Sequence, residues 1–549
     1  MTVSDPSQKH QRREHGLMLA LVSPALLVIL LLIVLPVGWL AWQSIYHDGF
    51  TLENYRRVFT EDIYWRSFAL TFEISLAVTL IALLLGYPLA YLANSVPKAW
   101  SILILSLVVL PFWTSVLVRA YAWLALLQRS GVINQFLRYF DVISEPLALV
   151  HNSFGTVVAT VHILLPFMVL PLYATMQKIP GDLMQAGASL GASPSLTFFR
   201  VFLPLSLPGV LAALHHGVRA LPRLLYHAGA ARRRPHRDGI DARESQRRAL
   251  QPVRCGQRRR RRAAHECARD LLRRQPLHLA RPRAGAEMMR ISPARIALYA
   301  ISALVLVYLI LPVLIIAPIS FSSARFLTFP PPSFSTRWYQ QYFTNPAWMQ
   351  ATRVTLTVAL FTVVIATPCG VAAAYAISQS KLRIMRVVHM ALLLPLVVPI
   401  IITAVGIFFV YAKVGLVATM PGLVLANVML GLPYVVISVL AGLQSFDPAQ
   451  EMVARSLGMN RLRSFFAVTL PQIKSSVVAG GIFAFISAMD ETIVALFISG
   501  GQYQPLTKRM FTALRDEIDP TIGAISTLMT AASFLLVLLA TTRQKRKVG

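Results

Sequence analysis

The chain has 549 residues, of which 56% are hydrophobic and 14% are charged, and its mean hydropathy of +0.60 excludes a soluble globular protein. Its formal net charge is +29, so its basic segments are expected to mark one side of a membrane. Its three cysteines, Cys255, Cys267 and Cys369, offer neither a disulfide framework nor a zinc-binding spacing, and no metal site is predicted.

Apolar runs of about 20 residues, the length that a helix needs to cross the hydrocarbon core of a bilayer, recur along the chain. The first part of the chain has four such runs, at residues 17–42, 68–93, 102–127 and 157–176. The second part has six, at residues 296–319, 354–377, 387–411, 423–443, 477–498 and 522–540. The sequence therefore predicts an all-α polytopic membrane protein with four helices and then six.

The first apolar run is longer than the core of a signal peptide and lacks a small-residue cleavage site, so we expect a retained helix. Basic residues precede this run, at Lys9, Arg12 and Arg13, and others stand in the C-terminal tail, at Arg543 and Lys545. If every run crosses the membrane, these residues fall on one side. Because positive charge is favoured on the cytoplasmic side, both termini are predicted to be cytoplasmic.

A polar loop between apolar runs occurs twice, and its characteristic residues are displaced by 267 positions. The first copy contains Leu190, Gly191, Phe198, Phe199, Leu203 and Pro204, and the second contains Leu457, Gly458, Phe465, Phe466, Leu470 and Pro471. A glycine between two short helical patterns lets them fold back on each other, which predicts a compact knob outside the bilayer. An ordinary loop would explain one copy, but not two with the same spacing. Two equal knobs indicate one partner with two-fold-like symmetry.

The repeat extends beyond these loops. At a displacement of 284, a second set of residues corresponds, namely Tyr55, Phe59, Thr71 and Tyr91 to Tyr339, Phe343, Thr355 and Tyr375. The first copy therefore carries 17 extra residues, which we place in an outer loop around residues 131–145. The pattern predicts two homologous halves in tandem, in parallel orientation because an even number of crossings separates them.

The repeated loop resembles the coupling loop of ABC importer permeases, a motif of Glu-Ala-Ala, three residues, Gly and a later Leu-Pro that docks into ATPase subunits. Its positions are occupied here by Gln185, Ala186, Gly191 and Pro204 in the first copy and by Met452, Ala454, Gly458 and Pro471 in the second. The glycine and the Leu-Pro agree with the motif, whereas Gln185 and Met452 replace its acid. The resemblance implies that two ATPase subunits, which carry ATP and Mg²⁺, engage the two knobs.

Within this superfamily, the chain resembles the spermidine/putrescine type of permease pair. The stretches that carry the resemblance are residues 110–119, 121–123, 489–497 and 517–522. Permeases for opines, aminoethylphosphonate and some thiamine-like cations are similar in these stretches. The resemblance implies a multi-pass protein of the bacterial inner membrane, in contact with membrane lipid, that receives its solute from a periplasmic binding protein and has no nucleic-acid partner.

Residues 214–287 depart abruptly from this pattern. They contain 20 Arg and no Lys, six acidic residues, and a single aromatic residue, Tyr226. By the repeat, the fifth and sixth helices of the first half should lie here, yet no apolar run marks them. The composition permits a disordered linker between fused halves. Residues 258–262 would suit a nucleic-acid or anionic-lipid tail, but the aromatic stacking partners of such a surface are missing.

A third interpretation of this block is translation in the wrong reading frame. One set of synonymous codons for residues 217–232, read one nucleotide later, encodes Ala-Phe-Val-Leu-Cys-Leu-Gly-Phe-Tyr-Ile-Thr-Pro-Ala-Leu-Leu, whose end resembles the first permease of this subfamily. We therefore favour two adjacent genes joined by a one-base frameshift, the second beginning at Met288 or Met289. The predicted organisation is a truncated first half (1–213), an Arg-rich segment (214–287) and a second half (288–549). Genomic sequence without a shift there would contradict this hypothesis.

Ionisable side chains inside a membrane span are costly and are therefore candidates for a solute pathway. Asp490 and Glu491 are predicted in the middle of the fifth helix of the second half, and Glu73 near the start of the second helix of the first half. A polycationic solute would also suit aromatic faces, which adds Trp113, Tyr121 and Trp123. The alternatives are a hydrogen-bonded acidic pair that braces the fold, an interfacial Glu73, and aromatic side chains that form an interfacial belt or a packed core.

No Gly-x-x-x-x-Gly-Lys-[Ser/Thr] sequence occurs, so the chain has no phosphate-binding loop, and we expect neither an enzyme nor a cofactor of its own. ATP hydrolysis is assigned to separate subunits. The expected function is that of the transmembrane permease of an ATP-driven importer for putrescine, spermidine or a similar small cationic solute. A non-transporting pseudogene product is the alternative from another class, because helices are missing. The paired knobs disfavour an ion-driven carrier.

Overall fold

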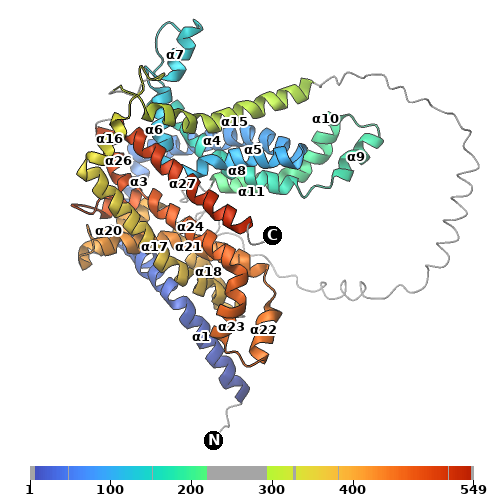
Figure 1. Cartoon of the computed structure of the whole chain (residues 1–549), viewed down its shortest axis with the longest axis vertical. Coiled ribbons are helices and arrows are strands. Elements are labelled where there is room, and N and C mark those ends of the chain that lie inside the picture. The colour runs from blue at the N-terminus through green and yellow to red at the C-terminus, as the bar shows by residue number, and fades with distance from the viewer. Residues whose placement is uncertain are drawn as a thin grey trace, which may run out of the picture. The chain divides into compact units, whose positions relative to one another are not determined.

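The computed structural model describes residues 6–46, 49–150, 152–218, 293–324, 329–380, 382–516 and 519–545 (Figure 1). This part of the chain consists of helices and short connecting loops, with isolated β-bridges but no strand. Nine of its helical segments are long and apolar enough to cross a membrane. The predicted all-α polytopic fold is therefore confirmed.

The first half begins with α1 (Pro6–Ile29), which continues through a π-helical turn (Leu30–Val34) into α2 (Leu35–Ile45). The short α3 (Glu53–Thr60) leads into the long α4 (Asp62–Ser95). Next come α5 (Lys98–Val109), α6 (Val116–Leu127), α7 (Val132–Tyr139) and α8 (Ser153–Met176). The half ends with α9 (Gly181–Ser189), α10 (Pro194–Thr197) and α11 (Leu203–Val218).

The second half begins with α15 (Pro293–Ser320), α16 (Arg337–Thr344) and α17 (Pro346–Gln379). It continues with α18 (Ile384–Leu392), α19 (Leu394–Val397), α20 (Ile400–Val414) and α21 (Met420–Gln444). Two short helices, α22 (Pro448–Ser456) and α23 (Arg461–Ser464), precede α24 (Leu470–Asp490). The last three helices are α25 (Ile493–Ile498), α26 (Leu506–Asp516) and α27 (Thr521–Lys545).

The two halves repeat helix by helix. Adding 284 to the bounds of α3 and α4 gives the bounds of α16 and α17, and adding 267 to those of α9 and α10 gives those of α22 and α23. The π-helical turns that follow, Phe198–Phe202 and Phe465–Thr469, also differ by 267. The change in displacement falls between α6 and α8, where α7 lies. The predicted tandem repeat and the insertion around residues 131–145 are thus both found in the structure.

Three of the predicted spans are interrupted. Residues 102–127 divide into α5, a 3₁₀ turn (Leu110–Trp113) and α6, with extended backbone at Thr114 and Ser115. Residues 387–411 divide into α18, α19 and α20, with extended backbone at Val398 and Pro399. These two breaks are equivalent positions of the repeat, and proline accounts for the second because it has no N–H and disfavours helix at the residue before it. The third break follows Asp490.

The sequence indicated that the fifth helix of the first half is absent, but the structure contains part of it. In the repeat α11 takes the place of α24, since Leu203 and Leu470 begin the two helices. It crosses the predicted boundary at residue 213 and is described as far as Val218. The predicted division at residue 213 stays a prediction, and residues 219–287 lie outside the described part of the chain.

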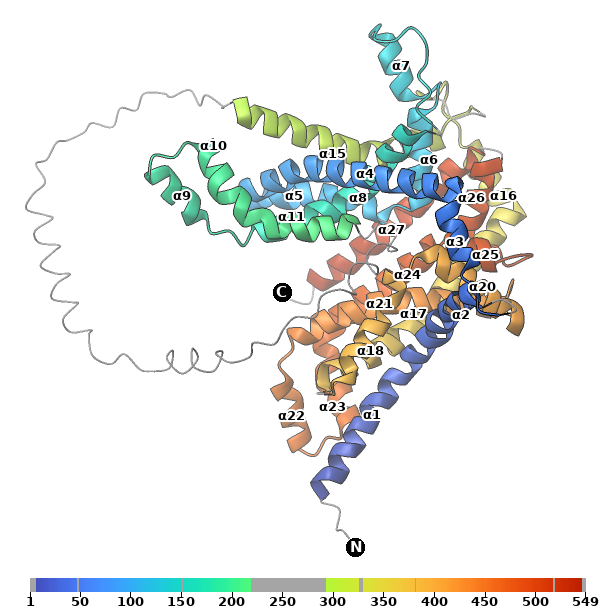
Figure 2. The same ribbon diagram turned by 180° about the vertical axis from the view of Figure 1, so that it is seen from behind.

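The first helix of each half packs into the core of the other half (Figure 2). The buried side chains of Met18 and Val22 in α1 share a hydrophobic cluster with α17 and α21. Conversely, Leu309 of α15 belongs to the cluster formed by α4, α5 and α8. Two polar contacts fix α15 there: the Tyr308 hydroxyl donates to the carbonyl of Val158, and His162 Nε2 lies 3.1 Å from the carbonyl oxygen of Leu309. This exchange of first helices joins the two halves.

Candidate functional site: two knobs and a helix break

Both knobs reverse the chain at a glycine. In the first knob (residues 181–202) Gly191 has φ +83°, and in the second knob (residues 448–469) Gly458 has φ +94°. The amide after each glycine returns to the preceding helix: Ala192 N–H donates to the carbonyl of Gly187 at 3.0 Å, and the equivalent bond in the second knob is 3.2 Å long. This is the glycine-ended helix cap that side chains with a Cβ rarely adopt. The predicted reversal at a glycine is present in both copies.

Each knob places a phenylalanine against a tyrosine of the long second helix of its half. The ring centroids of Phe198 and Tyr91 are 5.3 Å apart, and those of Phe465 and Tyr375 are 4.9 Å apart. The tyrosines are themselves equivalent in the repeat. The same aromatic contact therefore fixes both knobs to α4 and α17.

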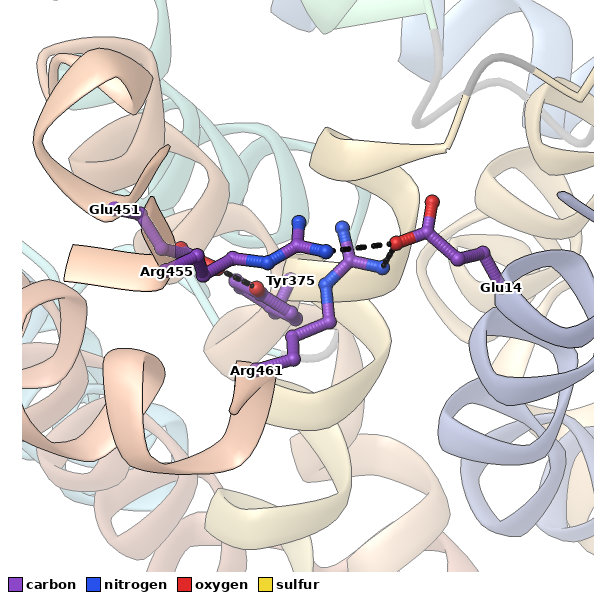
Figure 3. A network of polar contacts seen from close by, with 5 residues as sticks. All are labelled: Glu14, Tyr375, Glu451, Arg455 and Arg461. Carbon is purple, nitrogen blue, oxygen red and sulfur yellow. Dashed lines mark hydrogen bonds and ion pairs between the residues drawn. The ribbon is translucent and has the colours of Figure 1, made fainter. Parts of the chain in front are cut away.

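The second knob has a buried polar contact between Glu451 and Tyr375 (Figure 3), whereas the equivalent interior of the first knob is apolar. Glu451 is 4% exposed, and its carboxylate accepts hydrogen bonds from the hydroxyls of Tyr375 and, at 2.7 Å, Thr469. In the first knob the equivalent positions are Met184 and Phe202, which pack in the hydrophobic cluster around α4 and α8. Glu451 directly precedes Met452, the position at which the coupling motif was expected to carry its acid.

Glu14 of the first half forms ion pairs with two arginines of the second knob (Figure 3). Glu14, near the start of α1, accepts from Arg455 Nη2 at 3.0 Å and lies 3.4 Å from Arg461 Nη1. The side chains of Glu14 and Arg455 are about one third exposed, so the bridge stabilises the fold by no more than about 1 kcal/mol. Ala188 and Pro194 stand at the equivalent positions of the first knob, which therefore has no such bridge.

The two knobs expose the same apolar side chains. Leu190 and Leu457, just before the glycines, are 88% and 79% exposed, and Phe199 and Phe466 are also exposed. Beside Phe466, the second knob has a concavity of about 540 Å³. Most of the predicted docking residues lie on these surfaces: Gln185, Ala186, Gly191, Pro204, Met452, Gly458 and Pro471 are exposed, and only Ala454 is buried. Exposed apolar side chains repeated on equivalent knobs are typical of an interaction surface.

Asp490 and Glu491 were predicted in the middle of a helix, but they lie at a helix break. Asp490 ends α24, Glu491 has extended backbone, and α25 begins at Ile493. The Asp490 carboxylate accepts hydrogen bonds from the Ser115 hydroxyl and, at 3.4 Å, from the N–H of Val116. Ser115 is the N-cap residue of α6, so Asp490 occupies the N-terminus of a first-half helix. The helix break after Asp490 in the second half thus contacts the helix break at Thr114 and Ser115 in the first half.

The two carboxylates of the pair have different roles. Glu491 Oε1 accepts the N–H of Val494 at 2.7 Å and so caps α25, as the bracing alternative anticipated. The backbone carbonyl of Glu491 accepts the Thr507 hydroxyl at 2.7 Å, which ties the break to α26. Both Asp490 and Glu491 remain partly exposed. Only Asp490 is shared between the two halves.

Two of the three aromatic candidates are packed in the interior. Tyr121 and Trp123 of α6 are buried, and the Trp123 ring lies 5.2 Å from that of Tyr308 and 5.7 Å from that of His162. Arg119, one turn after Ser115, is 7% exposed and is an electrostatic neighbour of both Asp490 and His162. The packed-core alternative therefore holds for Tyr121 and Trp123.

The remaining candidates are Glu73 and Trp113. Glu73 is exposed on α4, and the side chain of Trp113 lies outside the described part of the structure. Sequence reasoning missed Ser115, Arg119, Glu14 and Glu451. Ser115 had a signal, since serine after a proline-containing apolar run is a common helix N-cap. Among the described residues, no group of three His, Cys, Asp or Glu could hold a metal ion.

Comparison with known proteins places these features among bacterial transport proteins. Residues 366–548 match the family model described as binding-protein-dependent transport system inner membrane component. The spermidine/putrescine transport system permease protein PotC of Haemophilus influenzae is 30% identical over 234 residues, which cover 42% of this chain and 90% of PotC. The corresponding protein PotB of Escherichia coli is 37% identical over 163 residues, 30% of this chain. The chain spans only 59% of that PotB and 56% of PotB from Salmonella typhimurium.

Two solved structures are also similar. An amino acid ABC transporter with histidines shares 19% identity at a TM-score of 0.31, over 38% of this chain and 98% of that one. A bacterial ABC transporter involved in the import of the acidic polysaccharide alginate shares 16% identity at a TM-score of 0.36, over 46% of this chain and 98% of that one.

Proposed function

Because the chain belongs to the family of binding-protein-dependent transport system inner membrane components, we propose that it is the membrane-spanning permease of an ATP-driven importer of polyamines. The observation that carries this proposal is the pair of knobs, which repeat the same helices, the same glycine turn and the same exposed leucine and phenylalanine. Two identical ATPase subunits need two equivalent docking surfaces, and the knobs supply them.

The choice of polyamines rests on two observations. PotB and PotC, which are named as spermidine/putrescine permeases, are similar to the chain. In addition, an aspartate stands at a helix break, and irregular backbone at membrane depth is tolerated where it is buried in protein or lines a water-filled cavity. A carboxylate there suits an ammonium group of the solute. A periplasmic binding protein would deliver that solute, and ATP with Mg²⁺ would be bound by the ATPase subunits.

Uptake of labelled putrescine and spermidine tests the proposal. The full chain would be expressed in an Escherichia coli strain that lacks PotB and PotC but keeps the remaining components of that system. We expect uptake above the level of the empty strain and loss of most of it in Asp490→Asn. Asp62→Asn, an equally conservative change at an exposed residue of α4, is the matched control.

Three outcomes would contradict the proposal. One is absence of polyamine uptake when the chain is present in the inner membrane with the ATPase and the binding protein bound to it. Another is uptake that continues after the ATPase gene is deleted, which would indicate an ion-driven carrier. A third is strong uptake of an opine or aminoethylphosphonate with none of putrescine, which would reassign the solute but keep the importer.

A further inference from the structure

We propose that Asp490 is a latch between the two halves, and that an ammonium group of the solute opens this latch by competing with the N-terminus of α6 for the same carboxylate. The inference rests on the proposed function, because it assumes a cationic solute. It adds a specific event to that function: the solute would break the contact that joins the two broken helices.

The geometry of the latch is that of a capped helix end. Ser115 has extended backbone and begins α6, a helix of twelve residues whose first N–H groups have no acceptor within the helix. The Ser115 hydroxyl also accepts the N–H of Leu117 at 3.3 Å, so its own proton is directed to Asp490. Asp490 accepts the N–H of Val116 as well. A carboxylate from the second half thus satisfies a helix end of the first half, where the helix dipole favours negative charge.

The latch is confined to one carboxylate. Glu491, the adjacent acid, is engaged with the N–H of Val494 in its own half. Arg119 lies one turn further along α6 and is an electrostatic neighbour of Asp490. The residues that meet at the latch are 375 positions apart in the chain. The contact therefore couples the broken third helix of one half to the broken fifth helix of the other.

A solute ammonium group is a direct competitor for this carboxylate. It offers a full positive charge and several N–H donors, whereas the helix end offers a partial charge, one hydroxyl and one long amide hydrogen bond. Asp490 is partly buried, and the competition requires the ammonium group of the solute to reach this carboxylate. Because the carboxylate cannot satisfy both partners fully, the solute binds the unlatched arrangement more tightly and shifts the equilibrium toward it.

Hydrogen–deuterium exchange at the start of α6 in the purified full chain tests the latch. The amide of Val116, read from overlapping peptides of residues 110–127, should exchange about tenfold faster in Asp490→Ala, the effect of losing one hydrogen bond to a charged group. Asp490→Asn keeps an acceptor but no charge, so exchange should rise less than in Asp490→Ala. Glu491→Gln is the neighbouring control and should leave Val116 unchanged.

Spermidine is the probe for the competition. At a saturating concentration it should accelerate exchange at Val116 in the unmodified chain and have no effect in Asp490→Asn. Ser115→Ala removes the competing hydroxyl, together with its N-cap bond to Leu117, so it should raise the affinity for spermidine in equilibrium dialysis by about tenfold. A merely structural role of Ser115 would lower the affinity or leave it unchanged.

Each result decides a separate point. Equal exchange at Val116 in Asp490→Ala and the unmodified chain would overturn the latch. Bound spermidine that leaves this exchange unchanged would overturn the competition. If dialysis shows no spermidine binding at all, the polyamine function and the competition both fail. The exchange rate of Val116 in Asp490→Ala still shows whether Asp490 caps α6.

Discussion

Glu451 and Met184 occupy the same position of the repeat but hold their knobs by different means. Glu451 accepts two hydroxyl hydrogen bonds in a buried site, whereas Met184 packs beside Phe202 in an apolar cluster. A buried carboxylate is tolerated only with such partners, and the cost of losing it is the unpaired donors left behind. The two knobs therefore share a backbone but differ in their sensitivity to substitution.

Glu451→Met should destabilise the chain although the first knob contains methionine at this position. The change leaves the hydroxyls of Tyr375 and Thr469 without their acceptor, at a cost of about 1–3 kcal/mol. Thermal unfolding in detergent should show a lower midpoint. Gln185→Met, at an exposed position of the first knob, should leave the midpoint unchanged. An unaltered midpoint in Glu451→Met would show that the carboxylate does not support the knob.

Leu190 and Leu457 should be needed for ATPase docking and dispensable for folding. Both are largely exposed, so Leu190→Asp and Leu457→Asp leave the core intact and place a charge on the docking surface. We expect each variant to reduce co-purification of the ATPase about tenfold or more, as for a central interface residue, at an unchanged unfolding midpoint. Leu52→Asp, at an exposed leucine outside the knobs, is the control. Full co-purification of the double variant would contradict the assignment of the knobs.

At the level of single helices, the sequence revealed where apolar runs lie but not where they break. The run at residues 387–411 contains Pro395 and Pro399, and these could have marked the break before α20. The break after Asp490 had no such signal, because the same residues can continue a helix unless tertiary contacts compete. Those contacts come from Ser115 and Val116, 375 residues away, and no local pattern predicts them.

The bridge from α1 to the second knob can be tested by charge reversal. Glu14→Lys places like charges beside Arg455 and Arg461 and should destabilise the contact between α1 and the knob by about 1 kcal/mol, a small effect because the side chains are partly exposed. Adding Arg455→Glu should recover part of the loss. The unfolding midpoints of the two single variants and the double variant measure the coupling, and strictly additive midpoints would show that the bridge contributes nothing.

At the level of the whole molecule, the repeat was readable from the sequence because its displacements of 267 and 284 are preserved residue by residue. The exchange of first helices between the two halves could not be predicted from the sequence. From Leu17 onward α1 is almost entirely apolar, as is α15 after Arg295, and nothing in such a stretch indicates which half it will cover. Only the buried clusters, with α1 beside α17 and α15 beside α8, reveal the pairing.

Because α1 packs into the core of the second half, we predict that the second half aggregates when it is made without the first half. A chain of residues 288–549 would lack α1, whose buried side chains share one hydrophobic cluster with residues of α17 and α21, among them Val358 and Val424. We expect it to aggregate in detergent and to become monodisperse when residues 1–60 are co-expressed as a separate chain. Size-exclusion chromatography distinguishes these states. A monodisperse second half without added residues would show that α1 is not required as a cover.

The place of α1 also sets an order of events during synthesis. Ile29 ends α1, and its main partner α17 ends at Gln379, 350 residues later. At about 5–20 residues per second, translation leaves α1 without that partner for roughly 20–70 s. During this interval its small and branched side chains, Val22 and Ala25 among them, face lipid or the insertion machinery. A newly made first half would therefore be held in the membrane as an incomplete intermediate, and its survival would depend on how soon the rest of the chain arrives.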